Sequence, residues 1–363
     1  MDHQSPSRPN IVLITPYYQP VVGGLTTFVT GLGKELVRRG AAVTVLTREG
    51  VEGPGVRRGP SNALAFVHWC RTTVREIAPD IIHCHGHWYC LAGALSKLGN
   101  PLAPRVVFTV HTVPDLLPVL RMPFRWLLHR AHVITFVSEH SQREFVDRFG
   151  LPNEWAVVPP GVSDLLAKAT VAPRGDSKGF RICAVSLMSY AGKVQGIRVL
   201  MEATARLARI VPETSLTLVG DGELRPDLEV TGQKLDLGDR VRFAGSVPDP
   251  VPILASSDAF CHISFRDSFP QAVLEAMSLS VPVIVNEGVL EDPIFRSLDS
   301  GVLHCPSDPD GVFQALRKLA ADPVGRRRMG AQGRELALRE FSWLRQADRF
   351  WALYGLTPGP KNR

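Results

Sequence analysis

The chain has 363 residues, of which 45% are hydrophobic, and a formal net charge of +6. This length suits two α/β domains of about 150 residues each, and the composition is that of a folded protein rather than a disordered one. The longest apolar runs are far shorter than the roughly 18 residues that a transmembrane helix needs, and the first ten residues do not resemble a secretion signal, so we expect a cytoplasmic protein. The charge is spread along the chain and does not select nucleic acid, a membrane or an anionic ligand.

The first predicted elements form a βαβ unit. Residues 10–15 (NIVLIT) predict a strand, residues 25–39 a helix and residues 42–46 a second strand. Such units build parallel sheets that bind ligands at the carboxyl ends of their strands. Gly23 and Gly24 lie in the first loop, immediately before the helix, where backbone amides can approach an anion closely. Four more segments continue the alternation of strand and polar loop, at residues 80–85, 105–112, 133–138 and 155–161. We therefore place a Rossmann-like domain at residues 1–170.

Three histidines, His83, His85 and His87, alternate at the end of one of these strands. They would share one face only while the strand continues, and Gly86 indicates that it ends there. We favour strand-end histidines facing a polar cleft over a metal site. The six cysteines contain no C-x-x-C pair, which favours buried thiols over a zinc site or disulfides.

A second domain begins after residues 171–179, a stretch rich in Pro, Gly and charge that predicts a linker. Strands at residues 180–189, 215–222, 241–247, 258–264 and 281–286, with a helix at 196–210, predict a second doubly wound domain over residues 180–340. Residues 341–363 predict a helix and tail. An apolar stripe on this helix must pack on the body of the protein, and it comprises Phe341, Trp343, Leu344, Phe350, Trp351 and Leu353.

The segment that points most strongly to a functional site is SFRDSFPQAVLEAMS, which contains two carboxylates. Asp267 lies in a polar loop and Glu275 lies eight residues later, two turns into the following helix. Carboxylates at this place suit the hydroxyl groups of a sugar and a ribose, while helix amides suit a phosphate. The alternative from the residues alone is a capping carboxylate and a solvated glutamate. The full G-x-G-x-x-G fingerprint and the P-loop Lys-Ser/Thr are absent, which argues against an NAD dehydrogenase and a P-loop NTPase.

The segment from Asp267 to Met277 resembles the Glu, seven residues, Glu signature (E-G-F-G-x-x-x-x-E-A-M) of family 4 of the retaining glycosyltransferases. Nine further segments resemble this family in order, among them PYYQPVVGGLTTFVTGLGKEL, FTVHT, VVPPGV and VGDGELRPDLE. The resemblance implies a GT-B fold, in which two Rossmann-like domains face each other across a cleft. It also implies an acceptor-side first domain and a second domain that binds a nucleotide-sugar.

The resemblance implies roles for individual residues. Glu275 would hold the ribose, Asp267 with the backbone of Ser268, Phe269 and Pro270 would meet the donor sugar, and His111 would lie near the transferred sugar. Two loops would flank the diphosphate and the nucleotide, and they carry Gly23, Gly24, Gly220 and Gly222.

The chain also departs from the family pattern. Leu187 replaces the Arg of the usual G-R-L, so we expect one cation, Lys193, to neutralise the leaving diphosphate. Gln195 is the alternative position for this residue, because it directly precedes Gly196. Asp267 replaces the first Glu, and Ser163 replaces an acidic residue.

The resemblance implies a retaining glycosyltransferase that uses a nucleoside-diphosphate sugar and acts on a small-molecule, glycan or lipid-linked acceptor. We expect no metal and no other cofactor, because no Asp-x-Asp is evident in a loop after a nucleotide-binding strand. Nucleic acid is not expected as a partner. A catalytically silent nucleotide-binding or partner protein and a nucleotide-sugar epimerase remain alternatives.

A basic segment with a helical pattern, residues 121–134, gives evidence about the kind of acceptor. Arg121, Arg125 and His129 fall four apart on one face, beside an apolar stripe of Phe124, Leu127 and Leu128. This pattern is typical both of an ordinary domain helix and of a weak membrane-surface helix, and Pro123 should limit where the helix starts. Peripheral membrane contact and a soluble acceptor therefore both remain open.

Overall fold

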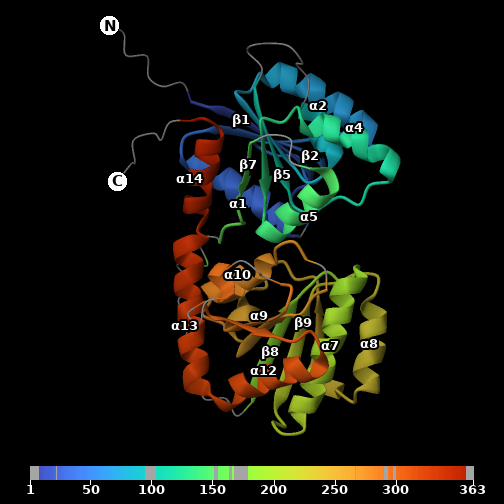
Figure 1. Ribbon diagram of the computed structural model, residues 1–363, viewed down its shortest axis with the longest axis vertical. Helices are drawn as coiled ribbons and strands as arrows, with labels where there is room; N and C mark the ends of the chain where they lie inside the picture. The colour runs from blue at the N-terminus through green and yellow to red at the C-terminus, as the bar shows by residue number, and fades with distance from the viewer. Residues whose placement is uncertain are drawn as a thin grey trace. The chain divides into compact units, whose positions relative to one another are not determined.

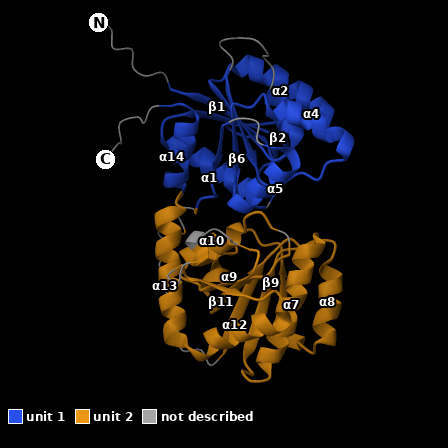
Figure 2. Ribbon diagram, viewed as in Figure 1, with its two compact units in different colours: residues 1–161, 343–363 blue, residues 162–342 orange. Residues whose placement is uncertain are grey.

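The computed structural model describes residues 8–21, 23–94, 104–150, 154–162, 166, 179–265, 267–289, 293–296 and 300–356. The chain forms two compact units, each a parallel sheet with helices packed on it (Figures 1 and 2). Unit 1 comprises Met1–Gly161 and Trp343–Arg363, and unit 2 comprises Val162–Ser342. The predicted fold class, two Rossmann-like parallel-sheet domains, is confirmed. Residues 167–178, which include almost all of the predicted linker, lie outside the described residues, as does Ser163.

Unit 1 contains a seven-stranded sheet in the order β3-β2-β1-β4-β5-β6-β7, with every described neighbouring pair parallel. Its strands are β1 (Asn10–Tyr17), β2 (Ala42–Glu49), β3 (Val56–Arg58), β4 (Ile81–His85), β5 (Arg105–Val110), β6 (Val133–Phe136) and β7 (Glu154–Val157). The central strands are buried on both faces, which is why they read as continuous apolar runs. The strand order reverses between β1 and β4, and such a switch point is where doubly wound sheets bind ligands.

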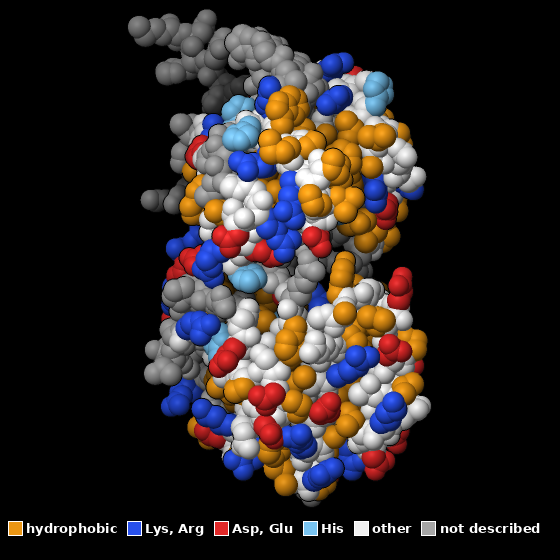
Figure 3. Space-filling view, turned by 45° about the vertical axis from the view of Figure 1, so that its right-hand side comes forward, with side chains coloured by type: hydrophobic (Ala, Val, Ile, Leu, Met, Phe, Trp, Pro, Cys, Tyr) orange, Lys and Arg blue, Asp and Glu red, His pale blue; other side chains and the backbone are white. Residues whose placement is uncertain are grey.

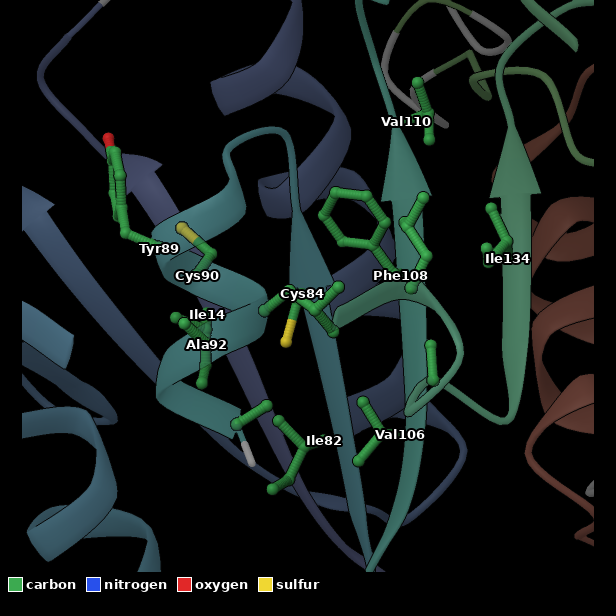
Figure 4. Packing of buried hydrophobic residues seen from close by; sticks show 14 of the residues in the cluster. Ile14, Ile82, Cys84, Tyr89, Cys90, Ala92, Val106, Phe108, Val110 and Ile134 are labelled. Carbon is green, nitrogen blue, oxygen red and sulfur yellow. The ribbon is translucent and has the colours of Figure 1, made fainter. Parts of the chain in front are cut away.

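The helices of unit 1 are α1 (Gly24–Arg38), α2 (Ala63–Ile77), α3 (Trp88–Ala94), α4 (Pro118–Leu128), α5 (Glu139–Phe149) and α14 (Trp343–Leu353). Figure 4 shows how Ile14, Ile82 and Phe108 from the sheet lie in one buried cluster with Tyr89 and Cys90 of α3. Two of these helices begin at a residue whose side chain caps the free backbone N–H groups of the first turn. The Asn62 side chain accepts from the backbone of α2, and Ser138 forms a capping box with α5.

The C-terminal helix α14 is part of unit 1 and packs against α1. Close approach depends on Gly31 of α1, because any side chain there would collide with the indole of Trp343. Trp343, Phe350 and Trp351 are buried as the apolar stripe predicts, but Leu344 is exposed. The stripe is therefore narrower than expected, since only the side of α14 that faces α1 and the sheet is covered.

Unit 2 contains a six-stranded parallel sheet in the order β10-β9-β8-β11-β12-β13. Its strands are β8 (Phe180–Val185), β9 (Thr214–Val219), β10 (Val241–Gly245), β11 (Ala259–His262), β12 (Val283–Asn286) and β13 (Val302–Cys305). Its helices are α7 (Ala191–Ala208), α8 (Arg225–Lys234), α9 (Val251–Ala255), α10 (Gln271–Ser278), α11 (Pro293–Arg296), α12 (Pro309–Ala321) and α13 (Pro323–Glu340), with a 3₁₀ turn at Gly238–Arg240. Its order reverses between β8 and β11, which gives unit 2 its own switch point.

Several element boundaries differ from the prediction. β1 and β2 extend to Tyr17 and Glu49, and α7 begins at Ala191 rather than at residue 196. The short edge strands β3 and β13 were not predicted, because neither carries a long apolar run. Pro123 lies inside α4, which instead begins with Pro118, a residue well suited to the first helical position.

Candidate functional site

The carboxyl ends of β8 and β11 meet at the switch point of unit 2 and carry two of the predicted catalytic residues. Lys193 lies in the first turn of α7, after β8, and Asp267 lies in the loop after β11. The Lys193 Nζ atom lies 3.2 Å from Asp267 Oδ2. The fold therefore brings together two residues that are 74 positions apart in the sequence.

Two local features hold the loop after β11 against the start of α7. Gly196 faces the backbone carbonyl of Ile263, and a side chain at this position would collide with it. The Asn286 side chain, at the end of β12, accepts from Ser264 N at 2.8 Å and donates to Ser264 O at 2.9 Å. The backbone N–H and C=O groups of Ser264 thus have hydrogen-bond partners, and the first residues of the loop that carries Asp267 are held in place.

Asp267 has two partners on one carboxylate oxygen. His262 Nε2 lies 3.0 Å from Oδ2, which also contacts Lys193, whereas Oδ1 makes no hydrogen bond within the described part of the chain. Burial alone would raise the pKa of Asp267, but hydrogen bonding and electrostatic attraction from His262 and Lys193 outweigh it and hold that pKa well below its usual range. Asp267 is therefore ionised at neutral pH.

Glu275 lies on α10 and is half-buried. Its carboxylate makes no hydrogen bond or ion pair among the described residues. Burial, with a smaller contribution from the nearby charge of Asp249, raises the pKa of Glu275 to about 7. A desolvated carboxylate that lacks a protein partner is well placed to accept hydrogen bonds from a ligand.

The loop between Asp267 and α10 contains Ser268, Phe269 and Pro270. Pro270 is buried and precedes the first residue of α10. The Phe269 ring lies about 6 Å from the rings of Phe295 and Phe341, centroid to centroid, so Phe269 contributes to core packing.

Gly220 and Gly222 follow β9, next to the turn after β8. Gly220 has a φ of 122°, and a side chain there would collide with the backbone of Ser186. A side chain on Gly222 would likewise collide with the backbone of Met188. Both glycines thus allow close backbone approach, but to the loop after β8 of the same chain. Their contact with a donor stays a prediction.

The predicted residues of unit 1 lie at the carboxyl ends of its central strands. Gly23 precedes α1, and Gly24 is its first residue. A Cβ at either position would meet nothing within 4 Å, so the amino end of α1 is open. His111 directly follows β5, and its Nε2 lies 3.3 Å from Nδ1 of His85. Burial lowers the pKa of His111 to about 3, which keeps this imidazole neutral at physiological pH.

The other histidines of this region do not form a metal cluster. His83 and His85 are both fully buried rather than cleft-facing. The ring nitrogens of His83 contact the Tyr354 hydroxyl at 2.7 Å and the Thr109 hydroxyl at 2.6 Å. His87 lies beyond the end of β4 and stacks on Tyr89. Within the described residues, no three His, Cys, Asp or Glu side chains are grouped so that they could hold a metal ion. All six cysteines are free and buried, as expected.

Sequence reasoning overlooked two features of unit 2. His262 was hidden inside an apolar strand, and the alternation of buried residues gives no sign of its contact with Asp267. An Asp-x-Asp pattern, Asp308 and Asp310, does follow a strand, the edge strand β13. The Asp308 side chain caps α12 and Asp310 pairs with Arg206, so both carboxylates already have structural partners.

Comparisons with known proteins agree with this architecture. A family model described as Glycosyltransferase Family 4 matches residues 22–164, and one described as Glycosyl transferases group 1 matches residues 185–336. A GDP-mannose-dependent alpha-(1-6)-phosphatidylinositol monomannoside mannosyltransferase of Mycolicibacterium smegmatis is 27% identical, over 93% of this chain and 96% of its own length. A D-inositol 3-phosphate glycosyltransferase of Kineococcus radiotolerans is 26% identical, over 97% of this chain and 96% of its own.

Solved structures share the fold. Sucrose-phosphate synthase from Thermosynechococcus elongatus has a TM-score of 0.81 at 20% identity, covering 96% of this chain and 98% of that one. The Anabaena protein HepE, in complex with UDP and glucose, has a TM-score of 0.79 at 18% identity, covering 96% of this chain and all of that one. From the two family models, which together match most of the sequence, and from the two-sheet fold, we conclude that the chain belongs to the GT-B glycosyltransferases of family 4 and group 1 and is an enzyme that transfers glycosyl groups.

Proposed function

We propose that this enzyme transfers a sugar from a nucleoside-diphosphate sugar to an acceptor hydroxyl, with retention of the anomeric configuration and without a metal ion. The observation that carries the proposal is the arrangement at the switch point of unit 2. A cation, Lys193, lies beside the ionised Asp267, and Glu275 on the adjacent helix is a half-buried carboxylate with no partner in the described chain. This set suits a diphosphate, sugar hydroxyls and a ribose, respectively.

The residues support the following reaction. The bond between the anomeric carbon and the diphosphate oxygen breaks, so negative charge grows on the diphosphate and positive charge on the sugar carbon. Lys193 stabilises the diphosphate, together with backbone amides at the start of α7. The acceptor oxygen attacks from the face that the diphosphate leaves, and its proton passes to the departing diphosphate. No side-chain nucleophile is needed, and retention follows from attack on the same face.

The metal-free part of the proposal rests on the charges available for the diphosphate. A magnesium ion beside phosphates would need carboxylates free to ligate it. Asp267 already binds two donors through Oδ2, Asp308 and Asp310 are engaged in a helix cap and an ion pair, and of these four carboxylates only Glu275 has no partner in the described chain. In the proposed mechanism the Lys193 ammonium supplies the positive charge instead.

The donor is best identified by ligand-induced stabilisation. A ligand that binds only the folded state raises the melting temperature, so we expect one nucleotide-sugar of a panel to shift it most. The panel includes GDP-mannose, named for the mycobacterial relative, and UDP-glucose, bound in HepE. Glu275→Ala should lose about 1–3 kcal/mol of nucleotide affinity, because a ribose hydroxyl pair loses its acceptor.

The matched control is Glu335→Ala, which removes an exposed carboxylate of the same unit and should leave the melting shift unchanged. If a folded Glu275→Ala variant binds nucleotide as tightly as the wild type, the assigned role of Glu275 is wrong.

We further propose that the acceptor side of unit 1 contacts membranes peripherally through α4. Among the described residues, no helix combines the length and the apolar character needed to cross a bilayer. The predicted stripe is indeed turned inward, since Phe124 and Leu128 are buried. The other side of α4 and its leading turn, however, expose five large apolar residues: Leu117, Val119, Leu120, Met122 and Trp126.

Charge favours an anionic lipid surface as the partner of this face. Arg121, Arg125, His129 and Arg130 are exposed beside the apolar residues, and residues 116–138 contain no Asp or Glu. Figure 3 shows hydrophobic side chains gathered with Lys and Arg side chains on the surface of unit 1. Exposed apolar residues flanked by arginines are typical of helices that lie in the membrane interface. Such a contact would present the enzyme to a lipid-linked acceptor.

A further inference from the structure

His262 ends the central strand β11 at the switch point of unit 2 and is buried among apolar neighbours. Phe260 and Cys261 before it and Ile263 after it are all buried. A buried imidazole is costly unless its polar atoms have partners, and the Nε2 atom of His262 contacts Asp267 Oδ2 at 3.0 Å. The role of His262 at this position therefore includes its contact with Asp267 and is not limited to apolar packing.

The contact with His262 involves the Oδ2 atom of Asp267, and the Oδ1 atom takes no part in it. His262 and Lys193 both contact Oδ2, from different elements, while Oδ1 has no hydrogen bond to the described residues. Two donors on a single oxygen restrict the rotation of the carboxylate. Asp267 also has a shorter side chain than the glutamate of the pattern that it resembles, so its reach depends more strongly on how it is held.

We propose that His262 is a positioning residue that fixes Asp267 and, through it, the Lys193 ammonium, so that Asp267 Oδ1 accepts a hydrogen bond from a hydroxyl of the donor sugar. This inference rests on the proposed donor site and adds a residue to it. His262 itself does not touch the donor. Its effect on turnover passes entirely through Asp267.

The test compares His262→Leu, which removes the donor at similar volume, with His262→Gln, which keeps a side-chain N–H. We expect His262→Leu to lower kcat for donor turnover about 10-fold or more, since small displacements of reacting groups carry large penalties. The Kd of the nucleoside diphosphate alone should stay within about twofold of wild type. His262→Gln should recover most of the lost kcat.

A double-mutant cycle separates positioning from packing. If His262 acts through Asp267, then His262→Leu should cause little further loss in an Asp267→Asn background. His304→Leu, which removes a half-buried histidine of β13 in the same unit, is the control and should retain wild-type turnover.

Three outcomes overturn the inference. It is wrong if the losses from His262→Leu and Asp267→Asn multiply independently, or if His262→Gln turns over the donor as poorly as His262→Leu. It is also wrong if His262→Leu is fully active while Asp267→Asn is impaired, a result that leaves the proposed function standing. A wild-type enzyme that neither binds nor turns over any nucleotide-sugar overturns the proposed function first, and this inference with it.

Discussion

Lys193 and Gln195 lie two residues apart in α7, and the sequence leaves both as candidates for the diphosphate cation site. In the structure Lys193 contacts Asp267, whereas Gln195 is exposed. We expect Lys193→Ala to lower kcat about 100-fold while the affinity for the nucleoside is nearly unchanged, because charge on the diphosphate grows in the transition state. Steady-state kinetics of both alanine variants check this. Greater damage from Gln195→Ala than from Lys193→Ala would refute the assignment.

Glu275 should also give a pH signature in stability. The folded state holds its proton up to a pKa of about 7, whereas the unfolded chain releases it near 4.5. The unfolded state therefore binds fewer protons in this window, and the free energy of unfolding falls as pH rises through it. Glu275→Gln removes this effect, so it should stabilise the protein by up to about 3 kcal/mol at pH 8 and have little effect at pH 4. Urea titrations at the two pH values test this, and an equal effect at both would contradict it.

At the level of single residues, sequence similarity predicted Lys193, Asp267 and Glu275 as site residues, and the structure brings the first two into contact. His262 could not be found this way. Its contact crosses a loop, and a histidine in a buried strand gives no sequence signal for a partner five residues on. The fully buried His83 was also misjudged, because Tyr354, which contacts it, is 271 residues away.

The exposed side of α4 is predicted to bind anionic membranes. The wild type should co-sediment with anionic vesicles at low salt and be released by high salt, because about three basic groups contribute roughly 1 kcal/mol each. Arg121→Glu with Arg125→Glu should abolish the binding, and so should Val119→Glu with Met122→Glu, whose side chains are 75% and 70% exposed.

Arg327→Glu with Arg328→Glu is the control for this experiment, since it makes the same charge change on an exposed part of α13 in unit 2. This variant should bind vesicles as the wild type does. If the wild type fails to bind, or if neither α4 variant weakens binding, the membrane contact is wrong and a soluble acceptor remains the better hypothesis.

Elements with strong periodic signals were predictable, and those shaped by tertiary contacts were not. The central strands were recognised from their apolar runs, since burial on both faces demands them. The exposed apolar side of α4 was missed, because the inward stripe of Phe124 and Leu128 already accounted for a domain helix. The early start of α7 at Ala191 was likewise not signalled, since Tyr190 before it provides no side-chain cap.

At the scale of the whole molecule, the repeated strand-and-loop rhythm predicted two Rossmann-like domains, and the strand orders of both units agree with it. The assignment of α14 to unit 1 could not be read from the sequence. It depends on the close approach of Trp343 to Gly31, two residues more than 300 positions apart. Such pairings appear only when the chain is folded.

The central claim, turnover of a nucleotide-sugar, is tested most directly by a proton NMR time course. The donor that stabilises the protein most is incubated with the enzyme, without and with candidate acceptors. We predict slow release of nucleoside diphosphate and free sugar without acceptor, faster transfer with retained anomeric configuration when the right acceptor is present, and strongly reduced rates for Lys193→Ala. Conversion of the donor to an epimer would instead identify an epimerase, and tight binding with no turnover under any condition would identify a catalytically silent protein; either result contradicts the account.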